Sequence, residues 1–398
     1  WGGSTWCCKP DISPCCSCSG GWGPDEVICR HMLPYFQKAR PGIAAAISEI
    51  LRNAAPRLGA ISPMGTQLAE RLESYAHAGK MIRGILVRLG YELCSAEAPG
   101  AVMDAVLNQA GAAMEFFQAG LLIHDDIMDR DTMRRGNATV HAQYEREAAL
   151  AQAADPTHHG VSLGVCAGDV AFFLGFNVLT ALPVPEAMGP RVRQVAAFSA
   201  QELSLVGVAQ MQDVRSGGGG IGSDPDPAQI LRIYRYKTGR YTFSMPLVAG
   251  ALLAGGSPAH LAALDQAGEN LGVVFQLKDD ELGIFGNAAQ SGKRADSDIR
   301  EDKKTLLRHF LFAAADAKLR ARLEQIFGSR EPREEGLQLV RVAMEQTGAR
   351  ARVREYMDCF AREAANCIAS LPPQAGACAE AARAAFQDLF RYSVERSG

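Results

Sequence analysis

The sequence predicts an all-α protein whose helices form one large bundle. From about Leu33 onward, apolar residues recur at helical spacing in one segment after another, and the alternating pattern of strands is nearly absent. The segments 115–129 and 271–285 are apolar on most sides until acidic residues appear, which is typical of helices buried inside a bundle. We therefore expect one all-α domain over about residues 32–398.

Helical segments and their breaks can be followed along the chain. Apolar residues at helical spacing mark three early segments, with Ile43, Ile47, Ile50 and Leu51 in the first, Leu86 and Leu89 in the second, and Val102, Val106 and Leu107 in the third. Turn-forming residues predict loops at 154–160, at 216–227 and at Pro372-Pro373. Because the residue before a proline disfavours helix, the helix that precedes Pro372-Pro373 should end at or before Leu371.

The composition excludes some classes of partner. Hydrophobic residues make up 47% of the 398 residues and charged residues 21%, as in ordinary globular proteins. A formal net charge of −3 gives no general attraction to nucleic acid. No signal peptide is recognised, and the longest weakly polar run, near 245–256, is too short to span a bilayer. We expect no nucleic-acid partner, no transmembrane segment and a cytoplasmic location.

The N-terminal segment differs from the rest. Residues 1–31 are rich in Gly, Ser and Pro, show no periodicity, and precede the first methionine, Met32. They also hold a group of cysteines, namely Cys7, Cys8, Cys15, Cys16, Cys18 and Cys29. Because the spacing is not the usual paired CxxC of zinc sites, a zinc knuckle is only the alternative. We expect a disordered or non-native extension over 1–31.

Two acidic motifs give the strongest chemical signal. Asp125 and Asp129 lie four residues apart, so on a helix both side chains leave the same face. Together with Asp126, and with Asp279 and Asp280 in the second motif, they follow apolar runs that place them at the ends of buried segments. Carboxylates gathered in this way repel one another unless a cation lies between them. Oxygen ligands at a hydrated site suit Mg²⁺, which commonly brings a phosphate. The motifs therefore predict a Mg²⁺ and diphosphate site.

Basic residues that could hold a diphosphate come from separate parts of the chain. They are Lys80 and Arg83, three apart on one predicted helix face; Arg134 and Arg135, just after the first acidic motif; Lys237, in an apolar and aromatic stretch; and Lys293 and Lys303, after the second motif. Arginine binds phosphate bidentately, whereas lysine acts as a mobile point charge.

The histidines near these motifs are not expected to bind metal. His124 points about 100° away from its neighbour Asp125 on a helix, so we expect it to be packed or hydrogen-bonded. His158 and His159 are expected in an exposed loop.

These motifs together resemble those of the trans-isoprenyl diphosphate synthases, the family of farnesyl, geranylgeranyl and longer polyprenyl diphosphate synthases. The resemblance runs from about Gly79 to Leu307 and is greatest to bacterial-type geranylgeranyl diphosphate synthases. The motifs that carry it, in the family's order, are Gly79-Lys80-x-x-Arg83; Gln118 with Leu122-Ile123-His124-Asp125-Asp126-Ile127-Met128-Asp129; Arg134-Arg135-Gly136; Ala167-Gly168-Asp169; Lys237-Thr238; Phe275-Gln276-Leu277-Lys278-Asp279-Asp280; and Gly292-Lys293 with Ser297-Asp298-Ile299-Arg300 and Lys303.

The resemblance implies a helical bundle around a central cavity, a homodimer, and a prenyltransferase that joins isopentenyl diphosphate to an allylic diphosphate (dimethylallyl, geranyl or farnesyl diphosphate). By it, three Mg²⁺ ions would be held on the allylic diphosphate by Asp125, Asp129 and Asp279, with Asp126 and Asp280 acting through water or from behind these ligands. The allylic diphosphate would be held by Arg134, Lys237, Lys293 and Lys303. Isopentenyl diphosphate would be held by Lys80, Arg83, Gln118 and Arg135. The catalytic group would be Lys237 with Thr238 and Gln276, the last two facing the forming carbocation.

The sequence departs from the family pattern at two positions, and two alternative functions remain open. Gly283 stands where many members have a third aspartate in the second motif, and Asp296 stands where many have a small residue. A class I terpene cyclase is one alternative, although the second metal motif of Asn, Ser and Glu that such enzymes show is not found. A non-catalytic subunit of a heteromeric prenyl synthase is the other, although this chain keeps nearly all the site residues.

Product length should depend on residues before the first acidic motif, where the resemblance places the chain-growth cavity. Gly120 and Leu121, five and four positions before Asp125, are not aromatic, whereas Phe116 and Phe117 lie one turn deeper. One turn adds about 5.4 Å, close to one isoprene unit. We expect a C20 product, geranylgeranyl diphosphate, with C25 as the alternative, and we expect a bulky side chain at position 120 to shorten it.

Overall fold

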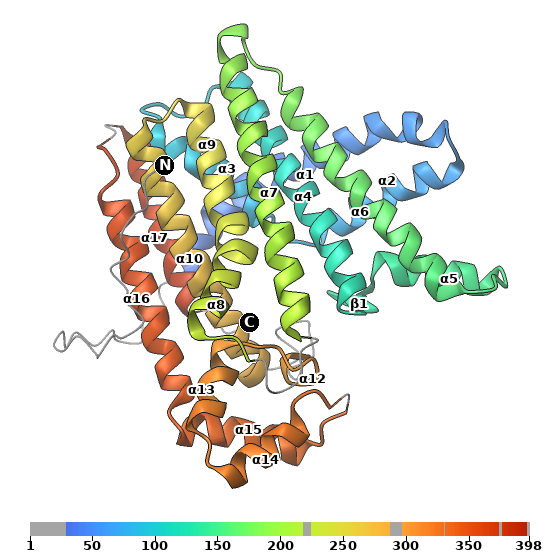
Figure 1. The fold of residues 1–398 in the computed structure, drawn as a ribbon. Coiled ribbons are helices and arrows are strands. Elements are labelled where there is room, and N and C mark those ends of the chain that lie inside the picture. Colours follow the sequence, from blue (N-terminus) through green and yellow to red (C-terminus); the bar gives the residue numbers. More distant parts are fainter. Residues whose placement is uncertain (1–28, 218–223, 287–296, 330, 374–375, 396–398) are drawn as a thin grey trace.

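A computed structural model describes residues 29–217, 224–286, 297–329, 331–373 and 376–395. Over these residues it is helical almost throughout, and its strands are β1 (Met133–Arg134) and β2 (Asn137–Ala138), which pair as a short antiparallel hairpin. The predicted all-α bundle is therefore confirmed (Figure 1). The N-terminal extension expected at 1–31 lies almost wholly outside the described residues, and the first helix begins at Cys29.

The described helices follow one another with short connections. In chain order they are α1 (Cys29–Gly59), α2 (Pro63–His77), α3 (Ile82–Cys94), α4 (Ala101–Met128), α5 (Val140–Leu150), α6 (Pro156–Thr180), the 3₁₀-helix η1 (Glu186–Met188), α7 (Gly189–Gly217), α8 (Pro227–Ile233), the π-helix η3 (Tyr234–Ser244), α9 (Met245–Ala254), α10 (Pro258–Phe285), α12 (Ser297–Arg300), α13 (Leu306–Ala314), α14 (Ala317–Ile326), α15 (Glu334–Gln346), α16 (Ala349–Ala369) and α17 (Ala377–Glu395).

Two long helices form the centre of the bundle. Helix α4 packs against α3 and α6, and α10 packs against η3 and α16. Figure 1 shows α16 and α17 on one side of the molecule, α2 and α5 on the other, and α13–α15 at one end. The predicted apolar stripes are buried, with Ile47, Leu86 and Val106 all 0% exposed. Val102 is the exception at 66% exposed, because it lies in the first turn of α4, beyond the core.

Helix α6 begins earlier than the sequence predicted. The expected loop at 154–160 is wrong from Pro156 onward, because Asp155 caps the helix and its side chain accepts a hydrogen bond from the His158 backbone N–H at 2.9 Å. Pro156 occupies the first turn, where its missing N–H costs nothing. His158 and His159 are exposed as expected, but on a helix. The pair Asp-Pro was thus a helix start and not a loop.

Helix α6 is a longer apolar segment than the sequence analysis recognised. Among the described residues it is long and apolar enough to cross a membrane by length and composition, with 28% of its most apolar window buried. The expectation that no run reaches this length is therefore wrong. A core helix satisfies the same two criteria, and α6 packs against α4 and α5.

Helix η3 makes a wide turn that packs unusually close to α10. Its backbone bonds span five residues, as in the bond from the Met245 N–H to the Arg240 carbonyl. Two glycines allow the approach: a Cβ added at Gly272 would lie 2.1 Å from the Gly239 Cα. π-Helical turns are rare and are frequently found at functional sites. The sequence predicted an apolar and aromatic segment here but not its wide geometry.

The close approach of η3 and α10 can be tested at Gly272. Gly272→Ala should destabilise the protein by about 1–3 kcal/mol, because the added methyl group must push two backbones apart. Gly207→Ala is the matched control, since nothing lies within 4 Å of a Cβ at this helical position; it should stabilise by about 0.5–1 kcal/mol. Thermal unfolding measures both, and equal melting temperatures for the two variants would contradict the crossing described.

Candidate active site

The first acidic motif lies at the C-terminal end of α4, and its aspartates face different surroundings. The side chains of Asp125 and Asp129 are 22% and 20% exposed, whereas that of Asp126 is 0% exposed. Asp126 accepts hydrogen bonds from the Tyr75 hydroxyl at 2.7 Å and from Arg134 Nε at 2.5 Å. Burial raises the pKa of Asp126, and Arg134 opposes this rise. Asp126 therefore holds α2 and the hairpin in place, while its neighbours reach the open side.

The second acidic motif, near the end of α10, is arranged in the same way. Asp279 is exposed and Asp280 is buried. Asp280 accepts a hydrogen bond from Gln276 Nε2 at 2.8 Å and a short one from the Tyr234 hydroxyl. Burial, and then the nearby Asp298 carboxylate, raise the pKa of Asp280 to about 8. The buried aspartate of each pair is thus engaged with protein groups.

Two lysines face the outward aspartates. Lys237 Nζ lies 2.6 Å from Asp213 and 3.7 Å from Asp125, and Lys303 Nζ lies 3.8 Å from Asp129. Burial lowers the pKa of each lysine, but the neighbouring carboxylates raise it by more, so the pKa of each lysine is raised. Burial and the Asp125 charge also raise the pKa of Asp129 to about 6. Acids and cations therefore converge on one space between α4, α7, η3 and α12.

The presence of glycine at position 283 is explained by Asp298, whose carboxylate lies next to it. A Cβ added at Gly283 would lie 2.7 Å from Asp298 Oδ2. Asp298 Oδ1 is also 3.8 Å from the Lys303 Nζ that approaches Asp129. The Asp298 carboxylate, from α12, thus occupies the place where a side chain at 283 would begin. Lys293 and Asp296 lie outside the described residues.

The residues expected to hold isopentenyl diphosphate come from the segment before α3 (Lys80), from α3 (Arg83), from α4 (Gln118) and from the hairpin turn (Arg135). Arg83 donates a hydrogen bond to Thr242 Oγ1 at 2.6 Å and stacks 4.5 Å above the Tyr241 ring. Gln118 Oε1 accepts a hydrogen bond from the Tyr241 hydroxyl. Lys80 Nζ is 2.7 Å from the Tyr392 hydroxyl of α17. Three of the four predicted residues are therefore connected to η3 or α17.

Arg134 and Arg135 point in different directions because of the hairpin turn. Arg135 and Gly136 both have positive φ, at 51° and 78°, which is the two-residue turn that suits antiparallel strands. Arg134 reaches Asp126, whereas Arg135 Nη1 lies 3.1 Å from where a Cβ at Gly79 would be. Burial, and then the charge of Arg134, lower the pKa of Arg135. An anion bound beside Arg135 would stabilise its positive charge and so oppose both the burial and the repulsion from Arg134.

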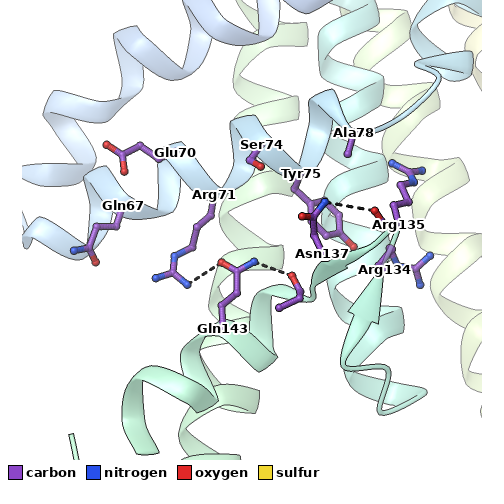
Figure 2. Close-up of a pocket in the computed structure, with 11 residues that line it drawn as sticks. Gln67, Glu70, Arg71, Ser74, Tyr75, Ala78, Arg134, Arg135, Asn137 and Gln143 are labelled. Atoms are coloured by element: carbon purple, nitrogen blue, oxygen red, sulfur yellow. Dashed lines mark hydrogen bonds between the residues drawn. The ribbon is translucent and has the colours of Figure 1, made fainter. Parts of the chain in front are cut away.

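A cavity of about 400 Å³ lies behind these arginines, between α2, the hairpin and α5 (Figure 2). Arg71, Arg134 and Arg135 line it, but no aspartate of either acidic motif does. Figure 2 shows Arg71 directed toward Gln143, to which it donates a hydrogen bond of 3.2 Å. The cavity gives access to the arginines from the α2 side.

The catalytic residues expected from the sequence meet across the close crossing of η3 and α10. Thr238 Oγ1 donates a hydrogen bond to Gln276 Oε1 at 2.7 Å, one residue from Lys237. Sequence reasoning missed the groups that support this arrangement, namely Tyr75, Asp213, Tyr234, Arg240 and the buried Glu115. Glu115 Oε1 accepts the Gly84 backbone N–H at 2.9 Å, next to Arg83. These residues carry no spacing signal, because they come from α2, α4, α7 and η3 and meet only in the fold.

The four candidate chain-length residues do not face one space. Phe117 lies against Phe176 of α6, with ring centroids 4.8 Å apart, and belongs to the core cluster that Leu121 contacts. Phe116 belongs to a different cluster, with residues of α1 and α2. A Cβ added at Gly120 would lie 2.9 Å from the Gly168 carbonyl oxygen. Phe117 and Gly120 therefore both face α6, whereas Phe116 faces the cluster that includes α1 and α2.

The carboxylates fit Mg²⁺ when the other ligands come from elsewhere. Among the described residues, no three or more acidic, histidine or cysteine side chains are grouped closely enough to hold a metal by themselves. Asp125 and Asp129 on α4 and Asp279 on α10 are separate donors of hard oxygen, which Mg²⁺ prefers, with water or phosphate completing its shell. His124 is not among these donors, since its Nε2 lies 3.1 Å from the Val165 carbonyl oxygen, as expected of a hydrogen-bonded histidine.

Comparisons with known proteins agree with this geometry. Residues 66–343 match the family model described as polyprenyl synthetase. The geranylgeranyl diphosphate synthases of Sulfolobus acidocaldarius and Mycobacterium tuberculosis are 31% and 30% identical over 58% and 61% of this chain. The farnesyl diphosphate synthase of Escherichia coli is 32% identical over 51% of this chain. The chain spans 63%, 61% and 63% of the lengths of these three relatives.

Solved structures match over more of the chain. The geranylgeranyl pyrophosphate synthase of Corynebacterium glutamicum, complexed with isoprenyl diphosphate and magnesium, superposes with a TM-score of 0.79 at 27% identity. That match covers 90% of this chain and 99% of the other. A geranylgeranyl pyrophosphate synthetase of Pyrococcus horikoshii, at 24% identity and a TM-score of 0.73 over 92% of this chain and 98% of its own, shares the fold. The chain belongs to the polyprenyl synthetase family.

Proposed function

We propose that this protein is a Mg²⁺-dependent prenyltransferase that condenses isopentenyl diphosphate with an allylic diphosphate to make a short all-trans prenyl diphosphate. One observation carries the proposal: the outward aspartates of α4 face Lys237 and Lys303 across a single space, at 3.7 and 3.8 Å. Such an arrangement suits a diphosphate whose charge is shared between metal ions and lysines. The named activities of the relatives support the same reaction.

The reaction breaks the allylic C–O bond, and diphosphate leaves with the electron pair. The double bond of isopentenyl diphosphate then attacks the allylic carbocation, a new C–C bond forms, and a proton is lost. Mg²⁺ bound at Asp125, Asp129 and Asp279 would neutralise charge on the leaving group. Lys237, with Lys303, would hold that diphosphate. Apolar residues deeper in the bundle exclude water that would quench the cation.

The two substrates would bind on opposite sides of η3. Arg134, Lys237, Lys293 and Lys303 would hold the allylic diphosphate, and Lys80, Arg83, Gln118 and Arg135 would hold isopentenyl diphosphate. Thr238 and Gln276 lie at the close crossing of η3 with α10 and would face the carbocation. A terpene cyclase has no use for the second basic set, so this set favours chain elongation over cyclisation.

The Mg²⁺ site would include Asp298 as well as the predicted ligands. A third aspartate in the second motif would stand at position 283, where this chain has glycine and where the Asp298 carboxylate lies 2.7 Å from the added Cβ. Asp298 would therefore supply, directly or through water, the negative charge that the motif lacks. Asp126 and Asp280 would act from behind, since protein donors already contact them.

The product would be geranylgeranyl diphosphate. A chain growing from Asp125 along α4 passes Leu121 after one turn and meets Phe117 after two, about 11 Å away. Phe117 is 0% exposed and is backed by Phe172 and Phe176 of α6. This aromatic group would stop growth near C20, with C25 as the alternative.

The exposed apolar face of α6 and α7 supports a homodimer. Large hydrophobic side chains are exposed on these two contacting helices, namely Val165, Phe173, Val208, Met211 and Val214, with Phe173 at 71% and Met211 at 73%. Patches of this kind usually mark an interface. The occupant we propose is a second copy of the chain. The cytoplasmic location stays a prediction.

The purified chain should convert isopentenyl diphosphate and an allylic diphosphate to longer prenyl diphosphates with Mg²⁺. Asp125→Asn should lower kcat/KM about a hundredfold, equivalent to about 2.7 kcal/mol of transition-state stabilisation. Asp358→Asn, on the exposed face of α16, is the control and should leave turnover unchanged. Cyclic hydrocarbon products would point to a terpene cyclase, and turnover only after addition of a second polypeptide would point to a heteromeric subunit.

The role of Asp298 can be tested by moving the carboxylate. Asp298→Asn should weaken Mg²⁺-dependent binding of inorganic diphosphate about tenfold, because one charged ligand group is lost. Gly283→Asp combined with Asp298→Ala should restore binding, since alanine clears the place where the new side chain begins. Calorimetric titration measures the dissociation constants. Unchanged binding in Asp298→Asn, with normal thermal stability, would remove Asp298 from the site.

Product length should respond to Phe117 and not to its neighbour. Phe117→Ala should shift the product toward longer chains, because it opens the space beyond Leu121. Phe116→Ala is the matched control: it removes the same buried ring, costing about 3–5 kcal/mol, but on the α1 and α2 side, and product length should not change. Mass spectrometry of the products measures the chain length that each variant makes. Gly120→Phe stays a prediction of a shorter product, and its side chain would begin 3.0 Å from the Phe172 ring of α6, which also packs against Phe117.

The homodimer should be sensitive to charge on α6. Phe173→Glu should convert the protein from two chains to one, measured as the mass in solution by light scattering. Ile61→Glu places the same charge at an 88% exposed site in the α1–α2 connection and should leave the mass unchanged. A wild-type mass equal to one chain would exclude the dimer.

A further inference from the structure

Arg240 is the centre of an ion-pair network on the far side of η3 from the acidic motifs. Its guanidinium binds Glu202 of α7 with two hydrogen bonds of 2.8 Å. It also contacts two carboxylates of α10, Glu269 at 3.0 Å and Asp265 at 3.4 Å. The Arg240 side chain is 17% exposed and that of Glu202 is 2% exposed. One arginine thus ties η3 to both helices that flank it.

The wide turn of η3 explains why this connection reaches the site. In a π-helix the backbone bonds join residues five apart, so each turn holds more residues than in an α-helix. Residues three apart therefore diverge more around the axis than they would on an α-helix. Lys237 consequently faces Asp125 and Asp213, whereas Arg240 faces Glu202 and Glu269. The two charged residues hold opposite sides of the same turn.

A π-helix of this length needs tertiary contacts to persist, because its geometry is unfavourable in isolation. The glycine crossing fixes η3 against α10 at Gly239, one residue before Arg240. Ser244, at the end of η3, donates a short hydrogen bond to Asp265, which Arg240 also contacts. The network and the crossing therefore act on consecutive residues of one turn, directly after Lys237 and Thr238.

We propose that Arg240 is a positioning residue, which holds the wide turn of η3 so that Lys237 and Thr238 face the acidic motifs. Arg240 itself touches neither substrate nor metal ligand among the described residues. This inference rests on the proposed function. We expect the allylic side to depend on Arg240 most, because Lys237 and Thr238 belong to η3, whereas Arg83 and Gln118 belong to α3 and α4 and only contact η3, at Thr242 and Tyr241. Helix α3 also has a support of its own, the hydrogen bond from the Gly84 backbone N–H to Glu115.

The test compares Arg240→Lys with Arg88→Lys. Arg88 is a matched control: its side chain is 12% exposed and donates to Asp104 at 2.6 Å and Asn108 at 3.1 Å, away from both acidic motifs. Lysine keeps the charge but cannot form the two parallel hydrogen bonds. In Arg240→Lys, KM for the allylic diphosphate and the Kd for inorganic diphosphate with Mg²⁺ should rise about tenfold. KM for isopentenyl diphosphate should change less than about twofold on the same scale. Arg88→Lys should alter none of the three.

A double variant separates positioning from folding. Arg240→Gln with Glu202→Gln removes the arginine together with its most buried partner. Glu269 keeps Arg235 at 3.3 Å and Asp265 is 36% exposed, so the melting temperature should recover in part relative to Arg240→Gln alone. The raised KM for the allylic substrate should persist. Recovery of both quantities, or equal effects on the two substrates, would show that Arg240 is only structural. A wild-type protein without turnover would instead contradict the proposed function, and the diphosphate titrations of the same variants would still decide the role of Arg240.

Discussion

The close crossing of η3 and α10 at Gly239 and Gly272 fixes the geometry on which the site depends. Side chains at both positions would force the backbones apart, since even a Cβ at Gly272 would lie 2.1 Å from the other chain segment. With the glycines in place, Thr238 reaches Gln276, and Tyr234 reaches Asp280. The same turn places Lys237 opposite the first acidic motif on α4. One steric constraint thus connects the two walls of the site.

Each acidic pair resolves the same electrostatic conflict. Two adjacent carboxylates at the end of a buried helix cannot both be stabilised by the protein and remain open to a metal. In both motifs the inward aspartate accepts hydrogen bonds from protein side chains. Asp126 accepts them from Tyr75 and Arg134, and Asp280 accepts them from Tyr234 and Gln276. The outward Asp125 and Asp129 instead approach Lys237 and Lys303 on the open side. Burial and the Asp125 charge raise the pKa of Asp129 to about 6, and the positive charge of Lys303 opposes this rise.

The sequence was sufficient for the fold and for the residue types of the site, because helical periodicity and short motifs are local signals. It placed the acidic motifs at the ends of α4 and α10, and it predicted hydrogen-bonded His124. It did not predict the π-helix, whose wide turn depends on packing against α10. It also missed Asp213, which reaches Lys237 from α7, and Arg240, which lies on η3 itself and binds Glu202. The start of α6 was missed because Asp155-Pro156 was interpreted as a turn when it is a capped helix start.

Adjacent residues on α4 show why a one-dimensional pattern cannot settle product length. Phe116 and Phe117 are equally bulky and equally buried, at 0% exposed, so sequence alone treats them alike. One step along a helix turns the side chain by about 100°, which sends Phe116 toward α1 and α2 and Phe117 toward α6. Residues four apart differ by about 40° around a helix, so Leu121 lies close to the face that begins at Asp125, and Phe117 lies a further step around, toward α6. We therefore propose Phe117 as the floor for the growing chain, supported from behind by the aromatic residues of α6.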